Sequence, residues 1–237
     1  MKFLPAGLAR RLRRWRHAGS PPVGTVDLGD LRRLDPISRD WGYDRGLPID
    51  RYYIEAFLSR ESSAIAGHVL EIGDNPYTRR FGGSRVTHSD VLHVSEGNPK
   101  ATIVADLTSA AHIPSDTFDC ILLIQTLQLI YDARAAIATA HRILRPGGVL
   151  LATFPGISQT TDATWGEYWN WSFTSLSARR LFGDVFSAGN VDVRAHGNVL
   201  VAVSFLQGLA TQELSLEELD YADPGYECLI TVRAAKP

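Results

Sequence analysis

Five residues that could bind a nucleoside lie at or next to the ends of short apolar segments. They are Glu71, Gly73, Asp90, Asp106 and Gln125. Asp90 lies 17 residues after Gly73, close to the spacing of about 20 at which an acidic side chain reaches a ribose. A carboxylate in that position accepts charge-assisted hydrogen bonds from both ribose hydroxyls. Because ligands of open parallel sheets bind beyond the carboxyl ends of the strands, these residues predict a nucleoside site at that edge.

The segments that must position these residues are predicted strands that alternate with helices. The strands are predicted at residues 68–73, 85–90, 101–106, 118–124, 149–154, 191–195 and 227–234. The helices are predicted at residues 49–57, 76–81, 133–144, 175–182, 200–206 and 214–219. Pro48 starts the first helix, Asp132 caps the third, and an RPGG turn leads into the fifth strand. This alternation is typical of an α/β fold with a parallel sheet and helices on both faces.

Charge and composition divide the chain into three parts. Residues 1–20 hold six basic residues and no acidic one, so the net charge of −2 combines +6 here with −8 elsewhere. This basic arm, with Leu8, Leu12 and Trp15 at helical spacing, is either a docking segment for an anionic membrane or an acidic partner, or a solvated terminus. Residues 21–66 form a lead-in with a helix, and residues 67–237 form the main domain. Within it, residues 156–174 and 197–226 are expected insertions that cover the substrate.

Composition and cysteine content argue against several classes of protein. Hydrophobic residues make up 45% and charged residues 21% of the chain, which is typical of a folded globular protein. The apolar runs are too short to span a membrane, and the arginines from Arg10 to Arg16 interrupt the place of a secretory signal, so a cytoplasmic protein is expected. The acidic body argues against a nucleic-acid partner. Cys120 and Cys228 lack metal-site spacing and are predicted to be buried thiols.

The order of several motifs resembles one enzyme family. These motifs are VLEIG, Asp90 after the second strand, ADLTSAAHIPSDTFDCILL, TLQLIYD and RILRPGGVLLATFPG. Over about residues 67–154, the chain resembles class I S-adenosylmethionine-dependent methyltransferases of the small-molecule, type 11 branch. The resemblance implies a Rossmann-like, doubly wound, mostly parallel sheet of seven strands with an antiparallel last strand, and S-adenosylmethionine as the cofactor. The residues implied to bind it are Glu71 and Gly73 at the methionine part, Asp90 at the ribose, and Asp106 with Leu107 at the adenine.

The turn after the first strand departs from this family, because two of its three usual glycines are replaced. The sequence there reads EIGDNPY over residues 71–77, and only Gly73 remains. Asn75 tolerates a left-handed backbone and caps helices well, while Pro76 favours the first helical position. We therefore expect a rebuilt cofactor turn to which Asp74 and Asn75 contribute, and in which the amides of a short helix face the ligand.

A second departure lies after the fourth strand, where Gln128 and Leu129 stand in place of the acid and histidine of many relatives. Gln125 is expected either to touch the cofactor or only to cap the next helix. Methyl transfer from a sulfonium is an in-line displacement that requires no metal, so no metal site is expected. A hydroxyl acceptor benefits from a general base. The candidates, each with a competing structural role, are His93, His196, Asp162 and Glu167.

An aromatic run, TWGEYWNWSF, follows the fifth strand. Trp165, Tyr168, Trp169 and Trp171 are expected to form an apolar wall for a sugar or ring substrate, or a lid packed on the core. The sequence thus predicts methyl transfer to an oxygen or nitrogen of a small molecule or glycan. The alternative is a catalytically inactive protein of this fold that docks on a partner. A nicotinamide-dependent dehydrogenase is disfavoured because the turn lacks G-x-G-x-x-G.

Overall fold

The computed structural model describes residues 20–160 and 166–237, which fall into two compact units. The first unit, Met1–Asp35, is described from residue 20 and contains the 3-10 helix η1 (Gly29–Leu31). The second unit, Pro36–Pro237, contains the predicted sheet. Almost all of the predicted basic arm lies outside the described residues, as do Asp162 and Trp165. Along the described ranges, every helix is too short or too polar to traverse a bilayer.

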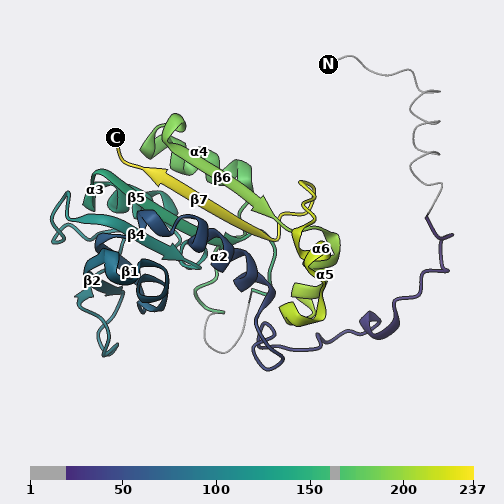
Figure 1. Ribbon diagram of the computed structural model, residues 1–237. Helices are drawn as coiled ribbons and strands as arrows, with labels where there is room; N and C mark the ends of the chain where they lie inside the picture. The colour runs from purple at the N-terminus through teal and green to yellow at the C-terminus, as the bar shows by residue number, and fades with distance from the viewer. Residues whose placement is uncertain (1–19, 161–165) are drawn as a thin grey trace, which may run out of the picture. The chain divides into compact units, whose positions relative to one another are not determined.

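A seven-stranded sheet organises the second unit (Figure 1). Its strands are β1 (Gly67–Ile72), β2 (Val86–His93), β3 (Ile103–Val104), β4 (Phe118–Ile124), β5 (Leu144–Pro155), β6 (Val191–His196) and β7 (Leu229–Ala235). They lie in the order β3-β2-β1-β4-β5-β7-β6, and only β7 runs antiparallel to its neighbours. The predicted fold is confirmed. The chain reverses its winding direction between β1 and β4, and the carboxyl ends of these two strands therefore flank the expected ligand crevice.

Helices pack on both faces of this sheet, as predicted. The α-helices are α2 (Ile49–Arg60), α3 (Ala133–Ile143), α4 (Ser175–Phe186), α5 (Val199–Leu206) and α6 (Leu216–Asp220). The shorter helical turns are η2 (Ser62–Ala64), the π-helix η3 (Thr78–Gly82), η4 (Gly83–Arg85), η5 (Leu127–Leu129), η6 (Ala188–Asn190) and η7 (Thr211–Glu213). Asp132 caps α3 as expected, since its carboxylate accepts a hydrogen bond of 2.9 Å from the amide of Ala135.

Two apolar cores hold these layers together. On one face, α3 and α4 bury Phe182 and Phe154 against the sheet. On the other face, α2 and α5 bury Phe57 and Val201. Cys120 and Cys228 are free and buried, as predicted, and burial raises the pKa of both thiols. The two cores fix the positions of the central strands and thereby the carboxyl edge of the sheet.

One part of the sheet is less covered than the rest. The connections from β2 to β3 and from β3 to β4, described along their whole length, contain no helix. Leu70 and Leu92, on one face of β1 and β2, belong to the same apolar core as Leu107, Ala110 and Ile113 of the helix-free connection from β3 to β4. Nearer the amino ends of these strands, His68 and His88 keep side-chain exposures of 21% and 63% on the same face.

Candidate functional site

Glu71 lies at the carboxyl end of β1, and its carboxylate is hydrogen-bonded to the turn that follows. The residue is only 4% exposed. Its carboxylate accepts hydrogen bonds from the amide and hydroxyl of Thr78 at 2.8 and 2.7 Å and from the amide of Tyr77 at 3.3 Å. Burial raises the pKa of Glu71, and these hydrogen bonds oppose the rise. Glu71 therefore shapes the turn by binding the free amides at the start of the short helix.

Gly73 is the point at which this turn offers backbone to a ligand. Its φ of +82° lies in the left-handed region that favours glycine. A Cβ built at this position would meet nothing within 4 Å, so open space lies beside the backbone. The amide of Gly73 donates to the carbonyl of Leu92 at 2.9 Å, and its carbonyl accepts from Asn98 at 2.6 Å. The turn is thus held rigidly while one side of it stays open.

Asn75 does not play the part predicted for it. Its backbone is not in the left-handed region. Its side-chain amide donates to the hydroxyl of Ser89 at 2.9 Å, and the helix amides that it was expected to cap are bound by Glu71. Both predictions for Asn75 are wrong because a buried carboxylate is the stronger acceptor and Ser89 on β2 lies within reach. The predicted helix start is nevertheless present, since Asn75 accepts from the amide of Arg79 at 3.1 Å.

The loop after β2 closes over the same turn. Lys100 binds the carboxylate of Asp74, and this hydrogen bond lowers the pKa of Asp74. Asn98, from the same loop, binds the carbonyl of Gly73. Asp74 also accepts from the amide of Asn75 at 2.7 Å. The polar groups of Asp74 are therefore engaged within the protein, as are those of Glu71.

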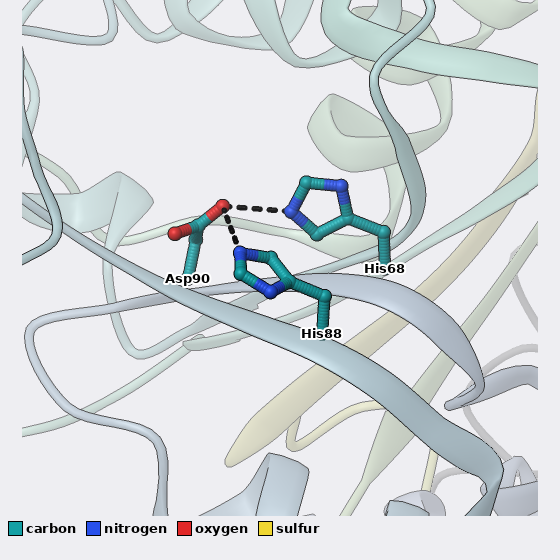
Figure 2. A group of neighbouring side chains, drawn as sticks. All are labelled: His68, His88 and Asp90. Carbon is teal, nitrogen blue, oxygen red and sulfur yellow. Dashed lines mark hydrogen bonds and ion pairs between the residues drawn. The ribbon is translucent and has the colours of Figure 1, made fainter.

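Asp90 does not end the second strand, and the prediction of its position is wrong. β2 continues to His93 because Val91 and Leu92, the two apolar residues after Asp90, are both buried. Asp90 pairs with Leu70, and its two carboxylate oxygens accept from Thr102 at 2.6 Å and from His68 at 2.7 Å (Figure 2). Burial opposes ionisation of Asp90, but these hydrogen bonds outweigh it and lower the pKa. Its assignment to the ribose stays a prediction that this position does not favour.

Gln125 directly follows β4 as predicted, whereas Asp106 and Leu107 lie beyond the end of β3, which stops at Val104 and not at the predicted Asp106. Asp106 accepts from the amide and hydroxyl of Thr108, both at 2.8 Å, and Leu107 is buried. Gln125 adopts a φ of +51°, a conformation that costs a non-glycine residue about 1 kcal/mol or more. Its amide oxygen accepts from Gln128 at 3.0 Å, while its amide nitrogen is buried without a partner. Strain and an unsatisfied donor thus coincide at the end of β4.

Four buried polar atoms without hydrogen-bond partners lie on segments that backbone hydrogen bonds join, namely the end of β4 with β5, and η5 with the aromatic segment. These atoms, named here the amide cluster, are Gln125 Nε2, Gln128 Oε1, Thr153 Oγ1 and Trp169 Nε1. The backbone amide of Gln125 donates to the backbone carbonyl of Thr153 at 2.8 Å, and this hydrogen bond joins the ends of β4 and β5. Buried polar groups in native proteins are normally paired. Each atom of the amide cluster is therefore available to a ligand. The sequence pointed to Gln125 but not to the other three as a group.

The aromatic segment of residues 166–173 is bound directly to η5. The carbonyl of Gln128 accepts from the amides of Asn170 at 2.8 Å and Trp171 at 3.2 Å. The indole of Trp171 donates to the carbonyls of Ile130 and Tyr131, both at 3.1 Å, and stacks on the ring of Tyr131. Trp171 therefore anchors the segment. Tyr168 is 58% exposed and Trp169 is half-buried.

The candidate general bases are not gathered at one point. His93 ends β2 and His196 ends β6, and four strands lie between β2 and β6 in the sheet. His93 Nδ1 lies 2.8 Å from the carbonyl of Ser95, and Glu167 is exposed. His196 Nε2 bonds the hydroxyl of Thr231 at 3.0 Å, and burial lowers the pKa of His196 to about 4. That imidazole is a weak base at neutral pH.

S-adenosylmethionine fits this edge of the sheet in two respects. The open space beside Gly73 admits a ligand to the backbone, and the unpartnered amide of Gln125 provides a donor on the neighbouring strand. Both lie beyond the carboxyl ends of β1 and β4, where the winding direction changes.

Comparison with known proteins points to the same cofactor. Residues 74–152 match a family model described as a methyltransferase domain. A SAM-dependent methyltransferase from Archaeoglobus fulgidus is 11% identical with a TM-score of 0.52, covering 78% of this chain and 94% of that one. The [4+2]-cyclase SpnF is 17% identical with a TM-score of 0.50, covering 81% and 84%. At these identities the likeness concerns the fold, and no curated protein matches the sequence. Residues 74–152 therefore contain a methyltransferase domain, and the whole chain shares its fold with a SAM-dependent methyltransferase.

Proposed function

We propose that this enzyme methylates an oxygen or a nitrogen of a small molecule or glycan. The observation that carries the proposal is the amide cluster, whose unpartnered atoms lie on segments joined by backbone hydrogen bonds. Its groups are amides, a hydroxyl and an indole, all of them uncharged. Such groups suit an acceptor with several neutral hydroxyl or amide groups better than a charged one.

The predicted cofactor residues divide into two groups in this proposal. Gly73, Asp106, Leu107 and Gln125 hold S-adenosylmethionine, which supplies an electrophilic methyl group when bound. Glu71, Asp74 and Asn75 act indirectly, because their polar groups are bonded within the turn and its flanking loop. The contribution of the protein is to orient the acceptor in line with the methyl group and to exclude water.

The aromatic segment forms one wall of the acceptor site in this proposal. Trp169 is half-buried with its indole nitrogen in the amide cluster, and the neighbouring Tyr168 is exposed. Aromatic faces pack well against sugar rings and other flat apolar surfaces. Trp171 instead fixes the segment to the residues that follow η5. In this proposal Tyr168 and Trp169 form the wall, and Trp171 packs on the protein as expected for a lid.

Cofactor binding can be tested with a matched pair of glycine variants. Gly73 and Gly147 have φ values of +82° and +78°, and an added Cβ meets nothing within 4 Å at either. Gly147 lies in the RPGG turn before the body of β5, at the other end of the sheet. Calorimetric titration should show that Gly73→Ala weakens S-adenosylmethionine binding at least about tenfold, or 1.4 kcal/mol, while Gly147→Ala binds like the wild type. Equal losses in both variants would assign the effect to backbone strain and not to the ligand.

The acceptor can be tested by mass spectrometry with panels of glycans, phenols and amines. A mass gain of one methyl group that requires S-adenosylmethionine, and that Gln125→Ala lowers, supports the proposed site. Cofactor binding without product from any panel would favour the alternative of an inactive docking protein. The likeness in fold to a [4+2]-cyclase shows that this architecture also occurs in a protein named for different chemistry, so both outcomes are informative.

A further inference from the structure

Two histidines and an aspartate meet on the exposed face of β1 and β2. His68 Nε2 lies 2.7 Å and His88 Nε2 lies 3.5 Å from the same oxygen of Asp90. Figure 2 shows both imidazole rings turned toward that oxygen, with His88 and Asp90 on one strand and His68 on its neighbour. The three donor atoms lie within 4.8 Å of one another. The arrangement is fixed by register, since His68 pairs with His88 and Leu70 with Asp90.

The carboxylate of Asp90 is oriented for this role by a neighbour. Thr102 donates its hydroxyl hydrogen to Asp90 Oδ1 at 2.6 Å, which leaves Oδ2 directed at the two imidazoles. The amide of Val91 donates to the same Thr102 hydroxyl at 2.9 Å and fixes it in turn. Ligating carboxylates in metal sites are typically held by such outer hydrogen bonds.

The surroundings combine an apolar floor with solvent access. The ring of His68 lies 4.7 Å from the ring of Phe118, and 4.5 Å from that of His88. His88 keeps 63% of its side chain exposed, whereas Asp90 keeps 14%. A bound ion would therefore be supported from the protein side and reachable from solvent. An ordinary ion pair needs one imidazole, and the second is directed at an oxygen that already has a partner.

We propose that His68, His88 and Asp90 bind a divalent transition-metal ion such as Zn²⁺. Two imidazole nitrogens and a carboxylate oxygen suit this class of ion and not Ca²⁺ or Mg²⁺, which prefer oxygen ligands. With ligand distances of about 2.0–2.1 Å, tetrahedral donors lie about 3.3 Å apart. The 3.5 Å separation of His88 from Asp90 already matches this geometry, and the 2.7 Å separation of His68 from Asp90 must lengthen by about 0.6 Å. Solvent completes the coordination on the exposed side.

This site is separate from the methyl-transfer site. Asp90 lies three residues before the end of β2, and Glu71, which faces the turn, alternates with Leu70 to the opposite face of the sheet. The ion would link β1 to β2 near the amino ends of the two strands. The proposal therefore does not depend on the proposed acceptor and adds no step to methyl transfer.

Calorimetric titration of the metal-stripped full-length chain with ZnCl₂ tests the proposal. We expect binding of one ion per chain, weakened at least about tenfold in His88→Ala. His112→Ala, at an exposed histidine between β3 and β4, is the matched control and should bind like the wild type. Circular dichroism should show that both variants fold, because each side chain is exposed. Cofactor affinity should be the same in His88→Ala as in the wild type.

A second probe reports the ligands themselves. Co²⁺ in a site with imidazole and carboxylate ligands gives visible d–d absorption bands, which should appear in the wild type and in His112→Ala and be lost in His88→Ala. Binding should also weaken on acidification, because protonated imidazoles do not bind metals. The proposal is overturned if Zn²⁺ does not bind at micromolar concentration, or if it binds equally to wild type and His88→Ala.

Discussion

The turn after β1 and the turn after β4 follow neighbouring strands at the same edge of the sheet, yet they treat polar side chains in opposite ways. In the first, the carboxylate of Glu71 accepts hydrogen bonds within the protein, and the side-chain nitrogen of Asn75 donates to Ser89. In the second, Gln125 and Gln128 each retain a buried atom without a partner. The first turn therefore leaves only open space beside Gly73, whereas the second leaves side-chain atoms available.

This difference indicates where the fold accepts an energetic cost for function. A buried polar atom without a partner costs about 1–3 kcal/mol, and the positive φ of Gln125 adds to it. Costs of this kind concentrate at functional sites, because elsewhere they are removed by selection for stability. The turn after β1 should accordingly behave as a structural element on mutation, and the turn after β4 as a binding element.

The largest effect is expected for Glu71→Ala. The substitution leaves the amides of Tyr77 and Thr78 and the hydroxyl of Thr78 without their acceptor. The free energy of unfolding should fall by about 3–4 kcal/mol, since several buried donors lose their partner at once. Urea denaturation measures this change, and Glu71→Gln, which keeps one amide oxygen as an acceptor, should lose less. A loss below about 1 kcal/mol in Glu71→Ala would show that the turn does not depend on this carboxylate.

A smaller effect, and one that depends on pH, is expected at His196. Burial lowers the pKa of His196 from 6.5 to about 4 in the folded protein. Below pH 6.5 His196 is protonated in the unfolded chain but stays neutral in the folded chain. Folding is therefore fully stable with respect to this group above pH 6.5, and stability is lost as the pH falls toward 4. Relative to His196→Gln, the wild type should lose about 2–3 kcal/mol between pH 7 and pH 4. Exposed His112→Gln is the control, and an equal pH dependence in it would contradict the assignment.

The sequence predicted elements well and side-chain partners poorly. β4 has the predicted bounds, and α3 has its predicted cap at Asp132, because both follow from local apolar periodicity and capping chemistry. The predicted end of β2 at Asp90 is wrong because the strand continues through the buried Val91 and Leu92. Asn75 was misjudged because its true competitor, Glu71, acts through the folded turn. The unpartnered atoms of Gln128, Thr153 and Trp169 belong to η5, β5 and the aromatic segment, and no local sequence pattern shows which polar atoms stay without a partner in the fold.

A modest gain in stability is expected for Gln125→Gly. Glycine adopts the φ of +51° without strain, so the free energy of unfolding should rise by about 1 kcal/mol while methyl transfer or ligand binding weakens. Ser187→Gly is the matched control, because Ser187 is exposed at the end of α4 with a φ of +68°. It should gain similar stability without a loss of function. If Gln125→Gly gains stability and keeps full activity, the strain at the end of β4 has no functional role.

The smallest effect is expected for Asp90→Asn on cofactor affinity. A carboxylate bound to the ribose would make this substitution weaken S-adenosylmethionine binding by about 1.5–3 kcal/mol, as for a hydrogen bond to a charged group. The structure instead engages both oxygens of Asp90 with Thr102 and His68, within β2 and not at its end. Calorimetric titration should therefore find cofactor affinity within about twofold of the wild type, or 0.4 kcal/mol, while Zn²⁺ binding falls. A large loss of cofactor affinity would support the assignment of Asp90 to the ribose. The carboxylate of Asp90 would then have to break its hydrogen bonds to Thr102 and His68 when the cofactor binds.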